Sequence, residues 1–207
     1  MQLHQLFPTA IATVQLALDP LDVAGQLQVL FGLRGDATGN PTEGCAWTGD
    51  LHGAWQLHQH PDFVDLTQQV AEQAWTYLEA VGFERSQVAL QLQRCWPVLS
   101  DWDQGVGRHH HPNAHLSAVL YLTGSGSGEE GCLRLQAPHR INELVPGLAV
   151  GHGGPIAEGH PLNADHWDLA PQSGLLVLFP SRLDHCVLPN TDPEALRCSI
   201  SFDFVLT

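Results

Sequence analysis

Apolar positions in the first part of the chain recur at helical spacing in two places. Asp19 and Pro20 are typical of an N-cap and a first helical residue, and the leucines after them are Leu21, Leu27, Leu30 and Leu33. A second stripe lies between Asp62 and Gly82 and consists of Leu66, Val70, Ala74, Leu78 and Val81. The pattern predicts two amphipathic helices. We expect the turn-rich segment between them, residues 35–53, to be irregular and at the surface.

From Gln87 onward the spacing changes to alternation or to short apolar runs bounded by Gly and Pro, which indicates strands. Five such runs begin at Val88, His115, Cys132, Leu175 and Arg197. Several short strands after two helices predict a β barrel or sandwich with helices packed on one side. We expect a flexible hairpin connection from Gly124, and a long loop over the barrel mouth from His139 to Pro171.

Length and composition narrow the class of protein. The 207 residues suit a single domain, with residues 1–86 as helical support and residues 87–207 as the barrel. The absence of lysine excludes a lysine Schiff base, a pyridoxal phosphate enzyme and a Walker-type phosphate loop. A formal charge of −14 argues against partners such as nucleic acid or an anionic membrane surface.

The five cysteines are odd in number and never form C-x-x-C, so the sequence predicts neither a disulfide framework nor a thiolate zinc site. No apolar run is long enough to span a membrane. The N-terminal residues lack the basic and apolar regions of a secretory signal. We therefore expect a cytoplasmic protein.

The densest chemical feature is the histidine-rich stretch RHHHPNAH, residues 108–115, directly before an apolar run. Alternate residues of an extended segment project to one face, so His109 and His111 can meet at one ion while His110 points away. His185, far downstream, would add a third imidazole if its strand lay beside this stretch. Imidazole suits iron, copper, zinc and nickel, so these ligands do not select a metal. A solvated polar loop is the alternative.

Arg197 and Ser199 lie two residues apart in the last strand and therefore face the same way. A guanidinium in an apolar strand needs an anionic partner, because it does not deprotonate. That partner is either an internal carboxylate, Asp203 or Asp184, or the carboxylate of a bound ligand. Arg108 has a similar choice between a surface salt bridge and an anionic substrate.

Three stretches in this order resemble the family of 2-oxoglutarate- and Fe(II)-dependent oxygenases: HHHPNAHLSAVLYL, GLLVLFPSRLDHCVLPN and RCSISFD, which begin at residues 109, 174 and 197. LFPTA, from residue 6, extends the resemblance over most of the chain. The resemblance implies a mainly β protein with flanking helices, built as a double-stranded β-helix or cupin-like jelly roll. It also implies a dioxygenase that hydroxylates a substrate and releases succinate and CO2.

The resemblance also implies site residues. The metal would be held by three histidines: His109, His111 and His185. The co-substrate 2-oxoglutarate would be held by Arg197 and Ser199 at its distal carboxylate, and its pocket would be lined by Tyr121 and Asn113. Three imidazoles leave up to three metal positions open for a chelating 2-oxo acid and dioxygen.

The chain departs from the wider superfamily at the His-x-Asp signature, because no acid follows two residues after any histidine of the 109–115 stretch. A literal His-x-Asp occurs at His166 and Asp168, but an apolar strand of about 20 Å separates it from His185, so we expect it to lie elsewhere. The missing oxygen ligand could come from Asn113, from Asp184 or from water.

Two other functions remain open from the sequence. A cupin-like three-histidine dioxygenase or isomerase would use the same barrel and histidines without a 2-oxo acid, and a non-enzymic jelly roll would bind a ligand or partner. Trp102 and Trp167, expected in loops near the mouth, are candidates for substrate contact. The sequence favours neither a small-molecule nor a peptidyl substrate, and it leaves a homodimer open.

Overall fold

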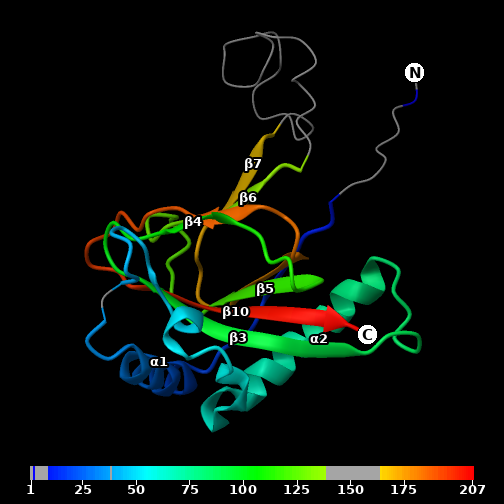
Figure 1. The fold of residues 1–207 in the computed structure, drawn as a ribbon, viewed down its shortest axis with the longest axis horizontal. Coiled ribbons are helices and arrows are strands. Elements are labelled where there is room, and N and C mark those ends of the chain that lie inside the picture. Colours follow the sequence, from blue (N-terminus) through cyan, green and yellow to red (C-terminus); the bar gives the residue numbers. More distant parts are fainter. Residues whose placement is uncertain (1, 3–8, 38, 139–163) are drawn as a thin grey trace.

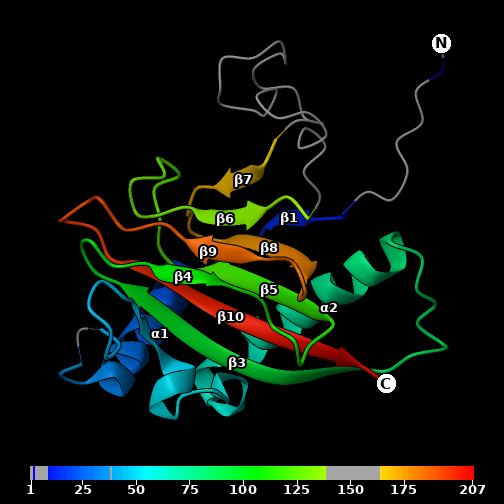
Figure 2. The same cartoon turned by 45° about the horizontal axis from the view of Figure 1, so that its top comes forward.

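The computed structural model describes residues 2, 9–37, 39–138 and 164–207. Its strands form two sheets in which every pairing between named strands is antiparallel (Figures 1 and 2). The larger sheet has the order β1 (Ala12–Gln15), β8 (Leu175–Pro180), β5 (Leu116–Tyr121), β10 (Arg197–Leu206), β3 (Leu90–Ser100) and β2 (Trp47–Thr48). The smaller sheet has the order β4 (Val106–His109), β9 (His185–Val187), β6 (Leu133–Gln136) and β7 (His166–Leu169).

Two α-helices, α1 (Pro20–Arg34) and α2 (Val64–Ala80), cover the outer face of the larger sheet, on the side away from β6 and β7 (Figure 1). Three short 3-10 helices lie between them: η1 (Gly49–His52), η2 (Leu57–Gln59) and η3 (Pro61–Phe63). Asp19 caps α1 by accepting a hydrogen bond from the Leu21 backbone N–H at 2.7 Å. Both predicted helices are therefore confirmed. No helix of the described ranges is long and apolar enough to cross a membrane.

The two faces of the larger sheet have different neighbours. Even-numbered residues of β5, β8 and β10, such as Leu120, Leu178 and Phe202, pack against the helices in the main core. Odd-numbered residues such as Val119 and Phe179 instead pack against β6 and β7 in a second cluster between the sheets. This alternation follows from the two-residue period of a strand. It directs the odd positions of β10 from Arg197 to Asp203 to the space between the sheets.

The structure corrects several expectations about the N-terminal part. Leu21 and Leu33 of the predicted stripe are exposed, and α1 instead buries Leu30 together with Gln26. The segment 35–53 is not wholly at the surface, since Trp47 is fully buried and β2 pairs with β3. Because β1 and β2 are strands of the larger sheet, residues 1–86 are more than helical support.

Two expected loops also contain more order than the sequence indicated. The connection after Gly124 is organised around Glu130, which is buried and accepts a hydrogen bond from the Ser125 backbone N–H at 2.7 Å. The expected long loop contains β7 near its C-terminal end, where Asp168 accepts two hydrogen bonds of 2.7 Å from Arg134. Residues 139–163 of that loop, like residues 6–8 of the LFPTA stretch, lie outside the described residues.

Candidate metal centre

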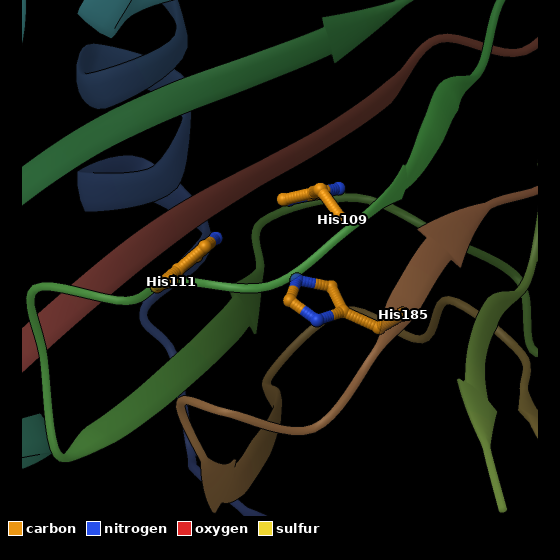
Figure 3. Close-up of side chains that lie close together, drawn as sticks. All are labelled: His109, His111 and His185. Carbon is orange, nitrogen blue, oxygen red and sulfur yellow. The ribbon is translucent and has the colours of Figure 1, made fainter.

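Three histidines, from β4, from the residues just after it and from β9, gather at one point between the sheets (Figure 3). His109 ends β4, His111 follows it by two residues, and His185 begins β9. The pairing of β4 with β9 places His109 directly opposite His185. One ring nitrogen from each histidine lies within 4.8 Å of the other two. The structure thus brings together the three histidines that the sequence selected, while the Nδ1 of His110 lies 3.3 Å from Asp184.

Hydrogen bonds at Nδ1 fix the orientation of all three rings. Each Nδ1 lies next to an acceptor: the Gly107 carbonyl at 2.7 Å for His109, the Leu183 carbonyl at 2.8 Å for His185, and the Asp203 carboxylate at 2.6 Å for His111. A carbonyl oxygen can only accept, so we assign the proton of His109 and His185 to Nδ1. Nε2 then carries the free lone pair that a metal needs. The donor set fits a divalent transition metal such as iron.

Burial keeps the rings of His109 and His185 in the form that binds metal. Desolvation lowers the pKa of His185 to about 3, and the neighbouring His109 and His111 lower it further when charged. Desolvation also lowers the pKa of His109, with a smaller opposing effect from its bond to Gly107. A histidine with a lowered pKa is neutral at neutral pH, and only a neutral imidazole can coordinate a metal.

These shifts predict how the stability of the metal-free protein depends on pH. Between about pH 6.5, the ordinary histidine value, and about pH 3, the unfolded chain binds a proton that folded His185 does not. Stability is therefore full above this window and falls as the pH drops through it. We expect a lower melting temperature at about pH 5 than at about pH 7.5, before most carboxylates titrate. Thermal unfolding of the chelator-treated protein measures this, and His185→Gln should reduce the pH dependence; an unchanged profile would contradict the assignment.

Arg197 lies beside the histidines with its guanidinium buried at 1% exposure. Its donors reach the Gly131 carbonyl at 3.2 Å, the Ser199 hydroxyl at 3.0 Å and the Tyr121 hydroxyl at 3.4 Å. None of these acceptors is charged, and no carboxylate of the described residues pairs with Arg197. The internal salt bridge considered from the sequence is therefore absent.

The two acids suggested as its partners are engaged elsewhere. Asp203 accepts from Arg94 at 2.5 Å, and Asp184 accepts from Arg108 at 2.6 Å. Arg108 thus forms the surface salt bridge that was one of its two expected roles. Asp184, which is partly exposed and paired with Arg108, is not among the ligand atoms gathered within 4.8 Å. Because both acids pair with other arginines, neither of them provides an anionic partner for Arg197.

One cavity of about 450 Å³ joins the histidines to Arg197 and Ser199. Tyr121 is fully buried behind Arg197, whose guanidinium carbon lies 5.0 Å from the centre of the tyrosine ring, so it contacts the arginine rather than the cavity. Asn113 is exposed in the turn after His111 and is not among the residues that line this cavity. The turn that follows His111 directs Asn113 to solvent, so Asn113 does not have the place in the pocket that the resemblance implied.

The structure adds residues that the sequence did not place at the site. The ring of Trp96 lies 5.5 Å from that of His111, and the guanidinium carbon of Arg94 lies 4.7 Å above Trp96. Asp203 had been considered only as a partner for Arg197. The sequence alone predicts that Asp203 faces the same way as Arg197, because it lies an even number of residues after Arg197 in the same strand. The contribution of Arg94 and Trp96 depends on which strand pairs with β10.

The N-terminal part supplies one wall of the cavity, which includes Thr48, Asp50 and Leu51. The candidate substrate contacts Trp102 and Trp167 are exposed and do not line it. His166 and Asp168 lie on β7 outside the histidine cluster: His166 hydrogen-bonds Asp165 at 2.5 Å, and Asp168 pairs with Arg134. This His-x-Asp, at residues 166–168, therefore does not form part of the site.

A comparison with known protein families agrees with this geometry. The model of a family described as "Putative 2OG-Fe(II) oxygenase" matches residues 94–203, more than half of the chain. The chain belongs to the 2OG-Fe(II) oxygenase family. It is accordingly an oxidoreductase with Fe(II) and 2-oxoglutarate as cofactors, as the resemblance in the sequence predicted. No curated protein matches the sequence.

Similar solved structures confirm the predicted fold, a double-stranded β-helix. The non-heme alpha ketoglutarate dependent carbocyclase SnoK from nogalamycin biosynthesis has a TM-score of 0.66 and 13% identity, covering 95% of this chain and 79% of its own. A Pseudomonas putida prolyl-4-hydroxylase has a TM-score of 0.56 and 20% identity, covering 95% and 92%. HygX from Streptomyces hygroscopicus, solved with nickel and 2-oxoglutarate bound, has a TM-score of 0.56 and 14% identity, covering 95% and 82%.

Proposed function

We propose that this oxygenase hydroxylates a C–H bond of a small molecule or a peptide, with Fe(II) held by three histidines: His109, His111 and His185. The observation that carries the proposal is one cavity that contains both three converging imidazoles and a buried guanidinium without a carboxylate partner. Bound Fe(II) and 2-oxoglutarate supply the oxidising chemistry, in which dioxygen is reduced as 2-oxoglutarate is converted to succinate and CO2 and one oxygen atom goes to the substrate.

The protein residues bind and orient the co-substrate. We assign Arg197 and Ser199 to the distal carboxylate of 2-oxoglutarate, since a planar guanidinium can hold a carboxylate through two hydrogen bonds. Tyr121 would hold Arg197 in place, because its hydroxyl accepts from the guanidinium and its ring lies beneath it. A buried guanidinium is costly without an anion, so this reading also explains why the arginine is there. A three-histidine enzyme without a 2-oxo acid would leave the guanidinium unexplained.

Apolar side chains from both sheets would keep water from the reacting groups. Val119, Leu133 and Phe179 line the cavity together with the histidines. A low-dielectric wall strengthens the interaction between Arg197 and a bound carboxylate. The cavity volume of about 450 Å³ is suited to the co-substrate and either a small molecule or one side chain of a peptide.

We also propose that residues 1–207 act as one domain in the cytoplasm. Support for one domain comes from the cavity, whose wall includes Thr48 and Asp50 from the N-terminal part and strands from the C-terminal part. Support for a reducing compartment comes from the five cysteines, all of which are free thiols. The acidic charge of −14 supports a substrate other than nucleic acid.

The proposal is tested by succinate release. Purified protein given Fe(II), 2-oxoglutarate and oxygen should produce succinate, and omission of either cofactor should stop it. Because turnover without the substrate can be slow, Fe(II) and 2-oxoglutarate binding should also be measured by calorimetry under nitrogen. Failure to bind either cofactor would overturn the proposed function.

A further inference from the structure

We propose that Asp203 is a positioning residue for the metal centre. In this role it holds His111 in the orientation that directs Nε2 to the metal, and it provides next to the ligands the negative charge that three imidazoles lack. The inference rests on the proposed function, because it requires His111 to be a metal ligand. It assigns an acidic residue to the surroundings of the metal, although none of the three candidate ligands is acidic.

Three side chains surround the Asp203 carboxylate, which has no exposed surface. Its Oδ1 accepts from the Nδ1 of His111 at 2.6 Å and from the Ser117 hydroxyl at 2.8 Å. Its Oδ2 accepts from Arg94 at 2.5 Å. The short contact with His111 is in the range of charge-assisted hydrogen bonds. The carboxylate therefore has a donor on each oxygen, and His111 has a fixed acceptor.

The sheet determines these contacts. Asp203 lies on β10 directly opposite Arg94 of β3 on one side and Ser117 of β5 on the other. Residues opposite each other in neighbouring strands have close side chains. Because the positions of the donors are set by backbone pairing on both sides, the carboxylate has little freedom to turn away from His111. Such rigid support is what a metal ligand requires for a defined geometry.

His111 differs from the other two histidines in the charge of its partner. His109 and His185 both donate to neutral backbone carbonyls, those of Gly107 and Leu183. Of these three histidines, only His111 has a carboxylate at Nδ1. A carboxylate makes an imidazole a more basic ligand than a carbonyl does. A purely structural role for Asp203 would be satisfied by Arg94 and Ser117 and would not need the short contact with His111.

The chain contains a natural control for this arrangement. Asp184 also accepts from an arginine, Arg108, and lies 3.3 Å from a histidine, His110. The side chains of this second group are partly exposed, and although Arg108 lines the cavity, neither Asp184 nor His110 lines it or belongs to the histidine cluster. Asp184→Asn therefore removes the same charge from the same combination of residue types without removing the Nδ1 partner of any of the three ligand histidines.

The test compares Co(II) and Fe(II) affinity in the wild type, Asp203→Asn and Asp184→Asn, measured anaerobically with the full chain. We expect Asp203→Asn to weaken metal binding about 10- to 100-fold and to change the visible absorption spectrum of bound Co(II). Asp184→Asn should retain the affinity and spectrum of the wild type. Thermal unfolding of the metal-free proteins checks that each variant is folded.

The outcomes separate this inference from the proposed function. If the wild type binds no metal, the proposed function fails. If the wild type binds metal and Asp203→Asn binds it equally well with the same spectrum, or if Asp184→Asn is weakened to the same extent, only the inference about Asp203 is overturned.

A measurement on the wild type alone tests the inference even if Asp203→Asn does not fold. In the Zn(II)-loaded protein, we expect the Nδ1–H proton of His111 to resonate further downfield than those of His109 and His185, because it donates to a carboxylate. Absence of a proton on the Nδ1 of His111, or a resonance no further downfield than the other two, would overturn the inference.

Discussion

Replacement of His185 with alanine should abolish Fe(II) binding by the folded protein. His185 is 4% exposed and begins the strand that pairs with His109, so no other described side chain can take its place at the centre. The loss of one of three protein ligands should weaken binding on the order of 100-fold or more, which is about 2.8 kcal/mol. Calorimetric titration with Fe(II) under nitrogen measures the affinity.

Two other histidines are matched controls for this prediction. His110 belongs to the same triplet but lies against Asp184, and His166 belongs to the literal His-x-Asp of residues 166–168. His110→Ala and His166→Ala should each bind Fe(II) as the wild type does. If either of them lost binding as completely as His185→Ala, the ligand set argued above would be wrong.

The two-residue period of a strand made much of the site readable from the sequence. It grouped His109 with His111 and Arg197 with Ser199, and the structure places each pair toward one cavity. The same period also places Asp203 on this face of the strand, although its sequence position suggested only a salt bridge with Arg197. Periodicity tells which residues share a face of one strand, and this information is local.

The remaining features depend on which strands are neighbours. The role of Arg94 follows from the pairing of β3 with β10, and local patterns do not specify that pairing. The segment 35–53 was expected at the surface because it is rich in turn-forming residues, although β2 within it adds to the edge of the larger sheet and Trp47 is buried. Asn113 was carried over from a resemblance, and the turn after His111 points it to solvent. In each case tertiary context outweighed local composition.

Replacement of Arg197 with leucine should remove 2-oxoglutarate binding and leave Fe(II) binding intact. The guanidinium is buried and its described partners are uncharged, so a bound carboxylate would be its main electrostatic partner. Loss of one side of a buried, hydrogen-bonded charge pair should weaken binding on the order of 100-fold. Arg197→Lys should bind with intermediate affinity, since it keeps the charge but cannot form two parallel hydrogen bonds. Calorimetry with the Fe(II)-loaded protein under nitrogen measures both variants.

Arg182→Leu is the matched control, because Arg182 is exposed and does not line the cavity that contains the histidines. It should bind both Fe(II) and 2-oxoglutarate as the wild type does. Retained 2-oxoglutarate affinity in Arg197→Leu would mean that the guanidinium serves only the packing around Tyr121 and Ser199. Loss of Fe(II) binding in the same variant would instead mean that Arg197 supports the histidines. Only separate effects on the two cofactors agree with a metal end and a carboxylate end within one cavity.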